Sequence, residues 1–212
     1  MNRTKIDWTD FTWNPWVGCR HGCEYCYARV VNDRYHIIKI WTQPEYFPQR
    51  LGDPARRKKP SKIFVGSMTD QFGPWVDDKS IINILAVVRS CPQHVFQFLT
   101  KYPERMRQFE FPDNAWVGTT VDHCSNAERS VHLSQVKARI RFISFEPLLS
   151  EMTVVPLDGI SWVIIGAMTG KEPISPKKSW VANIIGSVRA RHIPVFLKKN
   201  LSWPETIQEW PC

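Results

Sequence analysis

Residues 62–100 read KIFVGSMTDQFGPWVDDKSIINILAVVRSCPQHVFQFLT, and two hydrophobic periods alternate within them. The ends of this stretch, 62–67 and 95–100, are short and rich in β-branched and aromatic residues, which favours strands. Between them, aliphatic residues recur at helical spacing: Ile81, Ile82, Leu85 and Val88. They predict a helix over 78–89, with Asp77 as a start signal. A strand, a helix and a strand in this order indicate a parallel sheet with crossover helices.

The same alternation continues along the rest of the chain. Further strands are predicted at 115–120, 141–145, 162–166 and 195–198, and further helices at 102–109, 125–136 and 179–191, the last near a start signal at Ser175. A strand just before Cys19 and a helix over 24–35 precede them. At ~30 residues for each strand–helix unit, about six units and a last strand fill the chain, so we expect one domain over 1–212. Such units form a doubly wound sheet or a whole or partial barrel, and periodicity does not decide between these forms.

The composition is that of an ordinary folded protein, with 43% hydrophobic and 23% charged residues, and it excludes a disordered or fibrous class. The formal charge of +8 would attract an anionic partner, most commonly a nucleic acid. No apolar run reaches the ~20 residues needed to cross a bilayer, and the first residues lack the apolar core of a signal peptide. We therefore expect a cytoplasmic protein without membrane contact.

Ligands of parallel α/β folds bind at the carboxyl ends of the strands. The positions that follow predicted strands are 67–70, Lys101, 119–122, Glu146, 167–169 and 198–199. The basic run 56–59 precedes a strand instead and is expected at the opposite end. Cations expected near the site are Lys101, Arg105, Lys171, Lys198 and Lys199. They could form a groove for phosphates, although solvated loop lysines would show the same pattern.

A second informative segment, residues 13–29, reads WNPWVGCRHGCEYCYAR. Its spacing, Cys19-x3-Cys23-x2-Cys26, lets three thiolates of one tight loop converge on one face of an iron-sulfur cluster, and two loop glycines allow the necessary turns. Three ligands leave one iron open to an external ligand, as an incomplete protein shell does in catalytic metal sites.

The cysteine spacing leaves two other interpretations open. One is a structural zinc site with His21 or a remote residue as fourth ligand, although zinc sites usually pair two short Cys/His elements and the other three cysteines of the chain are isolated. The other is a redox pair formed by Cys23 and Cys26, which leaves Cys19 without a role.

The cysteine motif, with Tyr25 just before the third cysteine, resembles the signature of the radical S-adenosylmethionine (radical SAM) superfamily. The longer string over 18–29 is similar to spore photoproduct lyase-like proteins, and even more similar to the phage-associated three-cysteine-motif family. Segments 63–70, 98–101 and 145–148 also resemble that phage-associated family. The resemblance therefore covers most of the chain.

This resemblance implies a partial (βα)6-type TIM barrel of parallel strands with outer helices, and a cluster-binding loop at 18–27. Cys19, Cys23 and Cys26 would bind three irons of a 4Fe-4S cluster, and the amino and carboxylate groups of S-adenosylmethionine would bind the fourth. With an electron from an external donor, the cofactor would be split into methionine and a 5′-deoxyadenosyl radical that abstracts a substrate hydrogen. Because the spore photoproduct lyase group includes DNA repair enzymes, DNA is the expected substrate and partner.

The resemblance also implies cofactor contacts for single residues. Tyr25 would pack near the adenine, and Gly166 matches the position of a later adenine-contacting strand. The other expected cofactor contacts lie at strand ends: Ser67, Thr69, Asp70, Thr119 and Glu146. Relatives often carry a Gly-Gly-Glu-like element for the methionine amino group where this chain has 67–70. The chain lacks that glycine pair, but the Asp70 carboxylate could still bind an ammonium group.

Cys124, four residues beyond Thr120, is the candidate catalytic residue. Spore photoproduct lyases use an extra cysteine as a hydrogen-atom donor, whereas a free cysteine is also often a small buried residue.

Three functions remain open. The first is a radical SAM enzyme that repairs or modifies DNA, similar to a photoproduct lyase. The second is a radical SAM enzyme that acts on a peptide or small molecule, and the third is a zinc-dependent nucleic-acid-binding protein.

Overall fold

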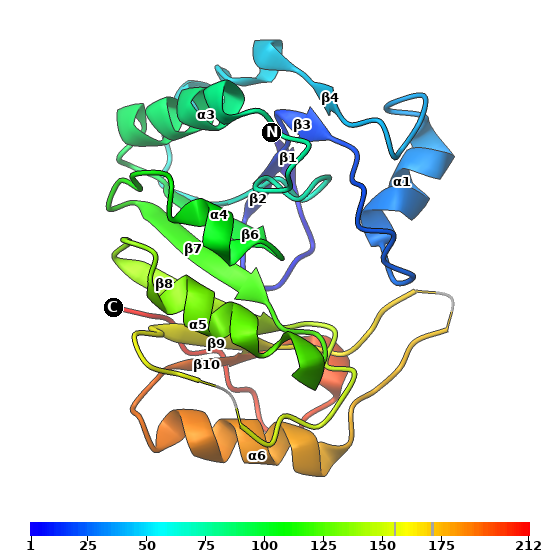
Figure 1. The fold of residues 1–212 in the computed structure, drawn as a ribbon, viewed down its shortest axis with the longest axis vertical. Helices are drawn as coiled ribbons and strands as arrows, with labels where there is room; N and C mark the ends of the chain where they lie inside the picture. Colours follow the sequence, from blue (N-terminus) through cyan, green and yellow to red (C-terminus); the bar gives the residue numbers. More distant parts are fainter. Residues whose placement is uncertain (155, 171) are drawn as a thin grey trace.

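One large sheet forms the centre of the fold (Figure 1), and the computed structural model describes residues 1–154, 156–170 and 172–212. Within these residues the sheet has eight strands, in the spatial order β1 (Asn2–Arg3), β2 (Phe11–Trp13), β5 (Lys62–Val65), β6 (Val95–Thr100), β7 (Ala115–Thr120), β8 (Ile140–Phe145), β9 (Trp162–Ile165) and β10 (Val195–Leu197). β1 pairs antiparallel with β2, and the pairings from β2 to β10 are parallel. The predicted α/β class with a large parallel sheet is confirmed.

Helices connect most successive parallel strands, although the described residues between β8 and β9 contain no helix. α3 (Asp78–Ser90) links β5 to β6, α4 (Pro103–Met106) links β6 to β7, α5 (Glu128–Ser134) links β7 to β8, and α6 (Lys178–Arg189) links β9 to β10. The spatial order of the strands follows their order in the chain, which is the arrangement expected of repeated strand–helix crossovers.

Strand residues alternate between two buried clusters, because successive side chains of a strand point to opposite faces. Ile63 and Val65 pack in the large cluster that includes the apolar residues of the helices, among them Ile81. Phe64, between them, belongs to a second, largely aromatic cluster on the other face. That cluster contains Trp8, Phe64, Phe142, Trp162, Ile164 and Phe196. Both faces of the sheet are apolar, as is typical of parallel sheets.

The segment between β1 and β2 connects the two ends of the sheet. Trp8 is buried in the aromatic cluster together with Phe196 of β10. The Lys199 backbone N–H, just after β10, donates to the Asp7 carboxylate at 3.0 Å. Residues near the start of the chain therefore pack against the last strand of the sheet.

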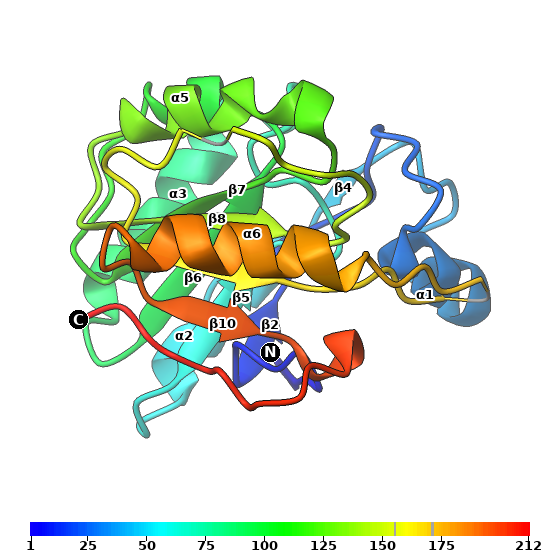
Figure 2. The ribbon, with the colours of Figure 1, turned by 90° about the horizontal axis from the view of Figure 1, so that it is seen from below.

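Smaller elements surround the sheet: β3 (Trp16–Val17), α1 (Tyr27–Tyr35), β4 (Glu45–Tyr46), η1 (Pro48–Arg50), α2 (Asp53–Arg56), η2 (Cys124–Asn126) and η3 (Lys199–Leu201). β3 and β4 pair with each other as a separate ribbon. Figure 2 shows α1 at the side of the molecule, away from the helices that cover the sheet. None of the described helices is long and apolar enough to cross a membrane.

The predicted strands and long helices agree with the observed ones to within about two residues at their ends, and differences concentrate in shorter elements. The strand directly before Cys19 is β3, which belongs to the separate ribbon, whereas the first parallel strand of the large sheet, β2, ends earlier, at Trp13. α1 begins at Tyr27 because the preceding residues form the cysteine loop. Asp77 caps α3 as predicted, whereas Lys177 and not Ser175 stands at the N-cap of α6.

Candidate functional site

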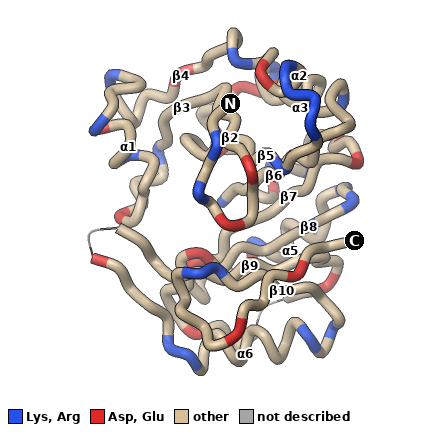
Figure 3. The backbone as a smooth tube through the Cα atoms, turned by 180° about the vertical axis from the view of Figure 1, so that it is seen from behind, with Lys and Arg blue, Asp and Glu red and all other residues tan. Residues whose placement is uncertain are grey.

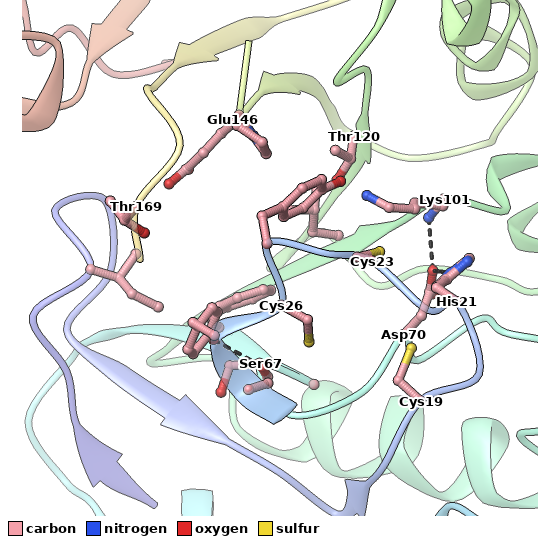
Figure 4. A pocket seen from close by; sticks show the side chains of 18 of the residues that line it. Cys19, His21, Cys23, Cys26, Ser67, Asp70, Lys101, Thr120, Glu146 and Thr169 are labelled. Atoms are coloured by element: carbon pink, nitrogen blue, oxygen red, sulfur yellow. Dashed lines mark hydrogen bonds and ion pairs between the residues drawn. The ribbon is translucent and has the colours of Figure 1, made fainter. Parts of the chain in front are cut away.

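A cavity of about 500 Å³ lies at the carboxyl ends of the parallel strands (Figure 4). Residues within two positions after strands β5, β6, β8, β9 and β10 line it, together with the last residue of β7: Gly66, Ser67, Lys101, Thr120, Glu146, Ala167 and Lys198. The cysteine loop contributes Cys19, His21, Cys23, Tyr25 and Cys26. The predicted location of the site is therefore where the structure has its large cavity.

The cysteine loop is fastened to the segment that follows β5. Gly18 has φ +104°, and a Cβ there would lie 2.8 Å from the backbone of Pro44 and Trp41, so this position needs glycine. Its N–H donates to the Met68 carbonyl at 2.9 Å, and its carbonyl accepts from the Thr69 hydroxyl at 2.6 Å. Thr69 thus holds the loop in place, besides lining the cavity.

The three loop cysteines are free and partly exposed, and all three line the cavity (Figure 4). Burial raises the pKa of the Cys19 thiol to about 11, and burial also raises the pKa of Cys26. These thiols keep their protons at neutral pH unless a cation binds, whereas a metal-bound thiol is deprotonated. Their chemistry therefore suits metal ligands better than free nucleophiles.

Among the described residues, no three His, Cys, Asp or Glu side chains converge tightly enough to hold one metal ion. A 4Fe-4S cluster presents a different iron to each thiolate, so its ligands surround a cluster instead of meeting at one ion. His21, the fourth ligand considered for zinc, has its Nε2 2.8 Å from the Asp70 carboxylate. Three cysteines on one loop beside a cavity are thus compatible with a cluster.

Asp70 is 6% exposed, and its carboxylate is surrounded by donors. It accepts hydrogen bonds from the Thr100 hydroxyl at 2.5 Å, the Lys101 N–H at 2.8 Å and the Phe72 N–H at 3.1 Å, in addition to its contact with His21. Burial alone would raise the pKa of Asp70, but the hydrogen bond and charge of His21 and these donors outweigh it and lower the pKa. The expected contact with a cofactor ammonium group would compete with these bonds.

Tyr25 forms a second tie between the cysteine loop and the sheet. Its hydroxyl donates to the carboxylate of Asp122, just after β7, and Lys101 Nζ lies 5.5 Å from the Tyr25 ring centroid. Burial opposes the charge on Asp122, but nearby Lys101 and the Tyr25 hydroxyl lower its pKa. Asp122 was predicted to follow a strand, but no role was predicted for it. Its partner Tyr25 lies 97 residues away in the chain, and such a contact leaves no local signal in the sequence.

Glu146 and Lys198 form an ion pair across the cavity wall. Gly166 leaves room for this pair, since a Cβ there would lie 2.9 Å from Lys198 Cδ and 3.0 Å from Glu146 Cγ. Thr119 is fully buried and donates to the Thr100 carbonyl at 2.9 Å, while its neighbour Thr120 lines the cavity. The alternation of side chains along β7 accounts for this difference of one residue.

The cations expected around the site are mostly engaged in ion pairs. Lys101 Nζ is 3.6 Å from Asp122, and Arg105 is 2.5 Å from Asp78 and also donates to backbone carbonyls. Lys198 pairs with Glu146, as described above. Lys199 is exposed, and Lys171 lies outside the described residues.

Cys124 is exposed at the start of η2, so its interpretation as a small buried residue is wrong. Its sulfur is 3.8 Å from Nδ1 of His123. Within the described residues, Cys124 is not among those that line the cavity. The structure therefore does not bring it together with the three loop cysteines.

A family model described as a protein of unknown function (DUF5131) matches residues 3–209. An uncharacterized protein of Methanocaldococcus jannaschii is 33% identical over 87 residues, which cover 40% of this chain and 33% of the relative. The match thus spans about a third of that relative's length. No solved structure matches the chain.

Proposed function

The chain belongs to this family of unknown function (DUF5131), and we propose that it is a radical SAM enzyme. The observation that carries the proposal is that Cys19, Cys23 and Cys26, on one loop, line a cavity at the carboxyl ends of parallel strands. Active sites of parallel α/β barrels and sheets lie at that end. A partial barrel of six strand–helix units is part of the proposal, supported by parallel strands that lie in chain order.

In this proposal the three cysteines hold three irons of a 4Fe-4S cluster, and S-adenosylmethionine occupies the fourth iron and part of the cavity. The volume of about 500 Å³ supports this, because sites for ligands of this size usually measure about 300–1,000 Å³. When both were bound and an external donor supplied one electron, they would provide the chemistry to split the cofactor into methionine and a 5′-deoxyadenosyl radical that takes a hydrogen atom from the substrate.

The chain's own residues would position the cofactors and exclude water. Trp8, Phe64 and Leu99 give the cavity an apolar wall, which keeps competing hydrogen donors away from a reactive carbon. Ser67 and Thr69 line the cavity beside the cysteine loop, in the region proposed for the methionine end of the cofactor. Glu146 and Gly166 are proposed to contact the cofactor from neighbouring strand ends.

DNA is the first candidate substrate, on the basis of the +8 charge and the sequence resemblance. A peptide or small molecule is the second candidate, and the ion pairs at the cavity favour it. Lys101 and Lys198 each face a carboxylate there, so their charges are largely compensated within the protein and less available to bind phosphates.

The test is anaerobic reconstitution with iron and sulfide, followed by metal and acid-labile sulfide analysis. We expect about four irons and four sulfides for each chain, and loss of the cluster when Cys19, Cys23 or Cys26 is replaced by alanine. Cys91→Ala is the matched control, because Cys91 is buried among apolar residues of the core. The reduced protein should convert S-adenosylmethionine to 5′-deoxyadenosine, measured by mass spectrometry. One stoichiometric zinc without sulfide would replace the proposal with the zinc alternative.

A further inference from the structure

A group of cations gathers at the end of the sheet opposite the cavity. It consists of Arg3, Arg56, Arg57, Lys58, Lys59 and Lys62, which we call the amino-end cluster. These residues lie on β1, on α2 and the turn after it, and at the first residue of β5. Figure 3 shows Lys and Arg positions concentrated beside α2. The cluster is therefore formed by segments from two regions of the chain.

Several cations of the cluster lie against aromatic rings. Arg57 lies 4.2 Å and Arg3 6.0 Å from the ring centroid of Phe11, so this ring has a guanidinium group from each of two segments near it. Lys62 Nζ lies 4.2 Å from the Trp210 ring. Such contacts orient the cations without neutralising them.

The cluster keeps most of its charge. Two carboxylates, Asp10 and Asp53, offset only part of the charge of its six cations: Asp53 pairs with Arg56 at 3.1 Å, and Asp10 accepts from the Lys62 N–H at 2.8 Å. Lys58 and Lys59 are exposed. At the cavity, Lys101 and Lys198 face carboxylates, and exposed Lys5 is a further lining cation. The larger net positive charge of the amino-end cluster gives it the stronger attraction for a polyanion.

We infer that the amino-end cluster binds a nucleic acid through its phosphate backbone. With six cations and two carboxylates, the cluster has the net positive charge that a polyanion requires. Contacts to phosphates carry no base-specific pattern. Binding to an anionic lipid surface would usually add exposed apolar side chains that enter the interface. Among the described residues, the large apolar side chains that are exposed lie elsewhere, on α1 and at Ile82, Val131, Val154 and Ile174 among others. A nucleic acid is therefore the better match.

This inference goes beyond the proposed function and does not depend on the iron-sulfur cluster. The surface lies at the opposite ends of the strands from the cavity, so it would hold a nucleic acid as a partner, whether or not that nucleic acid is the substrate. Metal and sulfide analysis tests the cofactor proposal, and DNA binding by the full chain, with and without reconstitution, tests this one. Either can fail without the other.

The experiment measures binding of fluorescent single-stranded and double-stranded DNA by anisotropy, from about 50 to 200 mM salt. The variant is Lys58→Glu with Lys59→Glu, and the matched control is Lys177→Glu with Lys178→Glu, an exposed adjacent pair at the start of α6 that changes the charge equally. We expect the first pair to weaken binding about tenfold or more, and to lower the salt slope by about 0.9 for each duplex phosphate that the variant no longer neutralises. The control should stay within about twofold of the unmodified protein.

Lys58→Gln with Lys59→Gln should give an intermediate loss, and circular dichroism checks that each variant folds. Equal binding by the two glutamate pairs would overturn the inference. So would absence of DNA binding in the unmodified protein, or binding to phosphatidylserine vesicles without binding to DNA, which would identify a membrane surface.

Discussion

The Nε2 atom of His21 lies 2.8 Å from a carboxylate oxygen of Asp70, although the two residues are 49 positions apart in the chain. His21 stands between Cys19 and Cys23, and Asp70 stands in the segment after β5. Together with the bond from Tyr25 to Asp122, this contact ties both halves of the cysteine loop to strand ends of the sheet. The loop is therefore held in position by side chains other than the three cysteines.

Replacing Asp70 by asparagine should destabilise the protein by about 3 kcal/mol near neutral pH, because buried donors lose a charged acceptor. The folded pKa of Asp70 lies below the ordinary value of 3.8. Its stabilisation is therefore present above the unfolded pKa and is lost as pH falls through the folded pKa. The difference in urea unfolding free energy between wild type and Asp70→Asn should shrink between about pH 6 and pH 2.5. Asp113→Asn, at an exposed position, is the control, and an equal difference at both pH values would refute the prediction.

Tyr25→Phe removes the hydroxyl that donates to Asp122 and leaves the ring in place. We expect the cysteine loop to open more often, at a cost of about 2 kcal/mol for a hydrogen bond to a charged acceptor. Hydrogen exchange of the loop amides, followed by mass spectrometry, should become faster. Tyr35→Phe is the matched control, since Tyr35 is 64% exposed. Unchanged exchange in Tyr25→Phe would show that this bond does not hold the loop.

Gly166→Ala places a methyl group against the Glu146–Lys198 pair. We expect a loss of about 1–3 kcal/mol, because the two side chains must shift to make room. Gly186→Ala, inside α6 with no neighbouring atom within 4 Å of the added Cβ, should instead gain about 0.5–1 kcal/mol from helix propensity. Thermal unfolding of both variants measures the contrast, and similar shifts of the same sign would contradict it.

Cys124→Ser should leave iron and sulfide content unchanged, because Cys124 is exposed and not among the described residues that line the cavity. In the folded protein its thiol should react with a soluble disulfide reagent, whereas buried Cys91 should react only on unfolding. Loss of the cluster in Cys124→Ser would mean that this cysteine reaches the cavity in solution.

The alternation of strand-like apolar runs with segments of helical apolar spacing was sufficient to predict the parallel sheet and most strand and helix boundaries. Apolar periodicity reports which faces of a strand or helix are buried, and this is a local property. Ile63, Val65 and Ile81 show the pattern in sequence and meet in one cluster in the structure. The exceptions, such as Trp16 and Val17 in a separate ribbon, are two-residue strands, which are too short to produce a period.

The sequence by itself also determined that Cys19, Cys23 and Cys26 share one short segment, and it predicted a ligand site where the strands end. Only the tertiary structure decided how the charges around that site are compensated. Lys101, Arg105 and Lys198 face Asp122, Asp78 and Glu146, and these partners come from other elements of the fold. Electrostatic energy depends on the distance between charges and on their burial in space. A count of cations at strand ends therefore could not show that these three cations have carboxylate partners. It also could not show that the less compensated cations lie at the opposite end of the sheet.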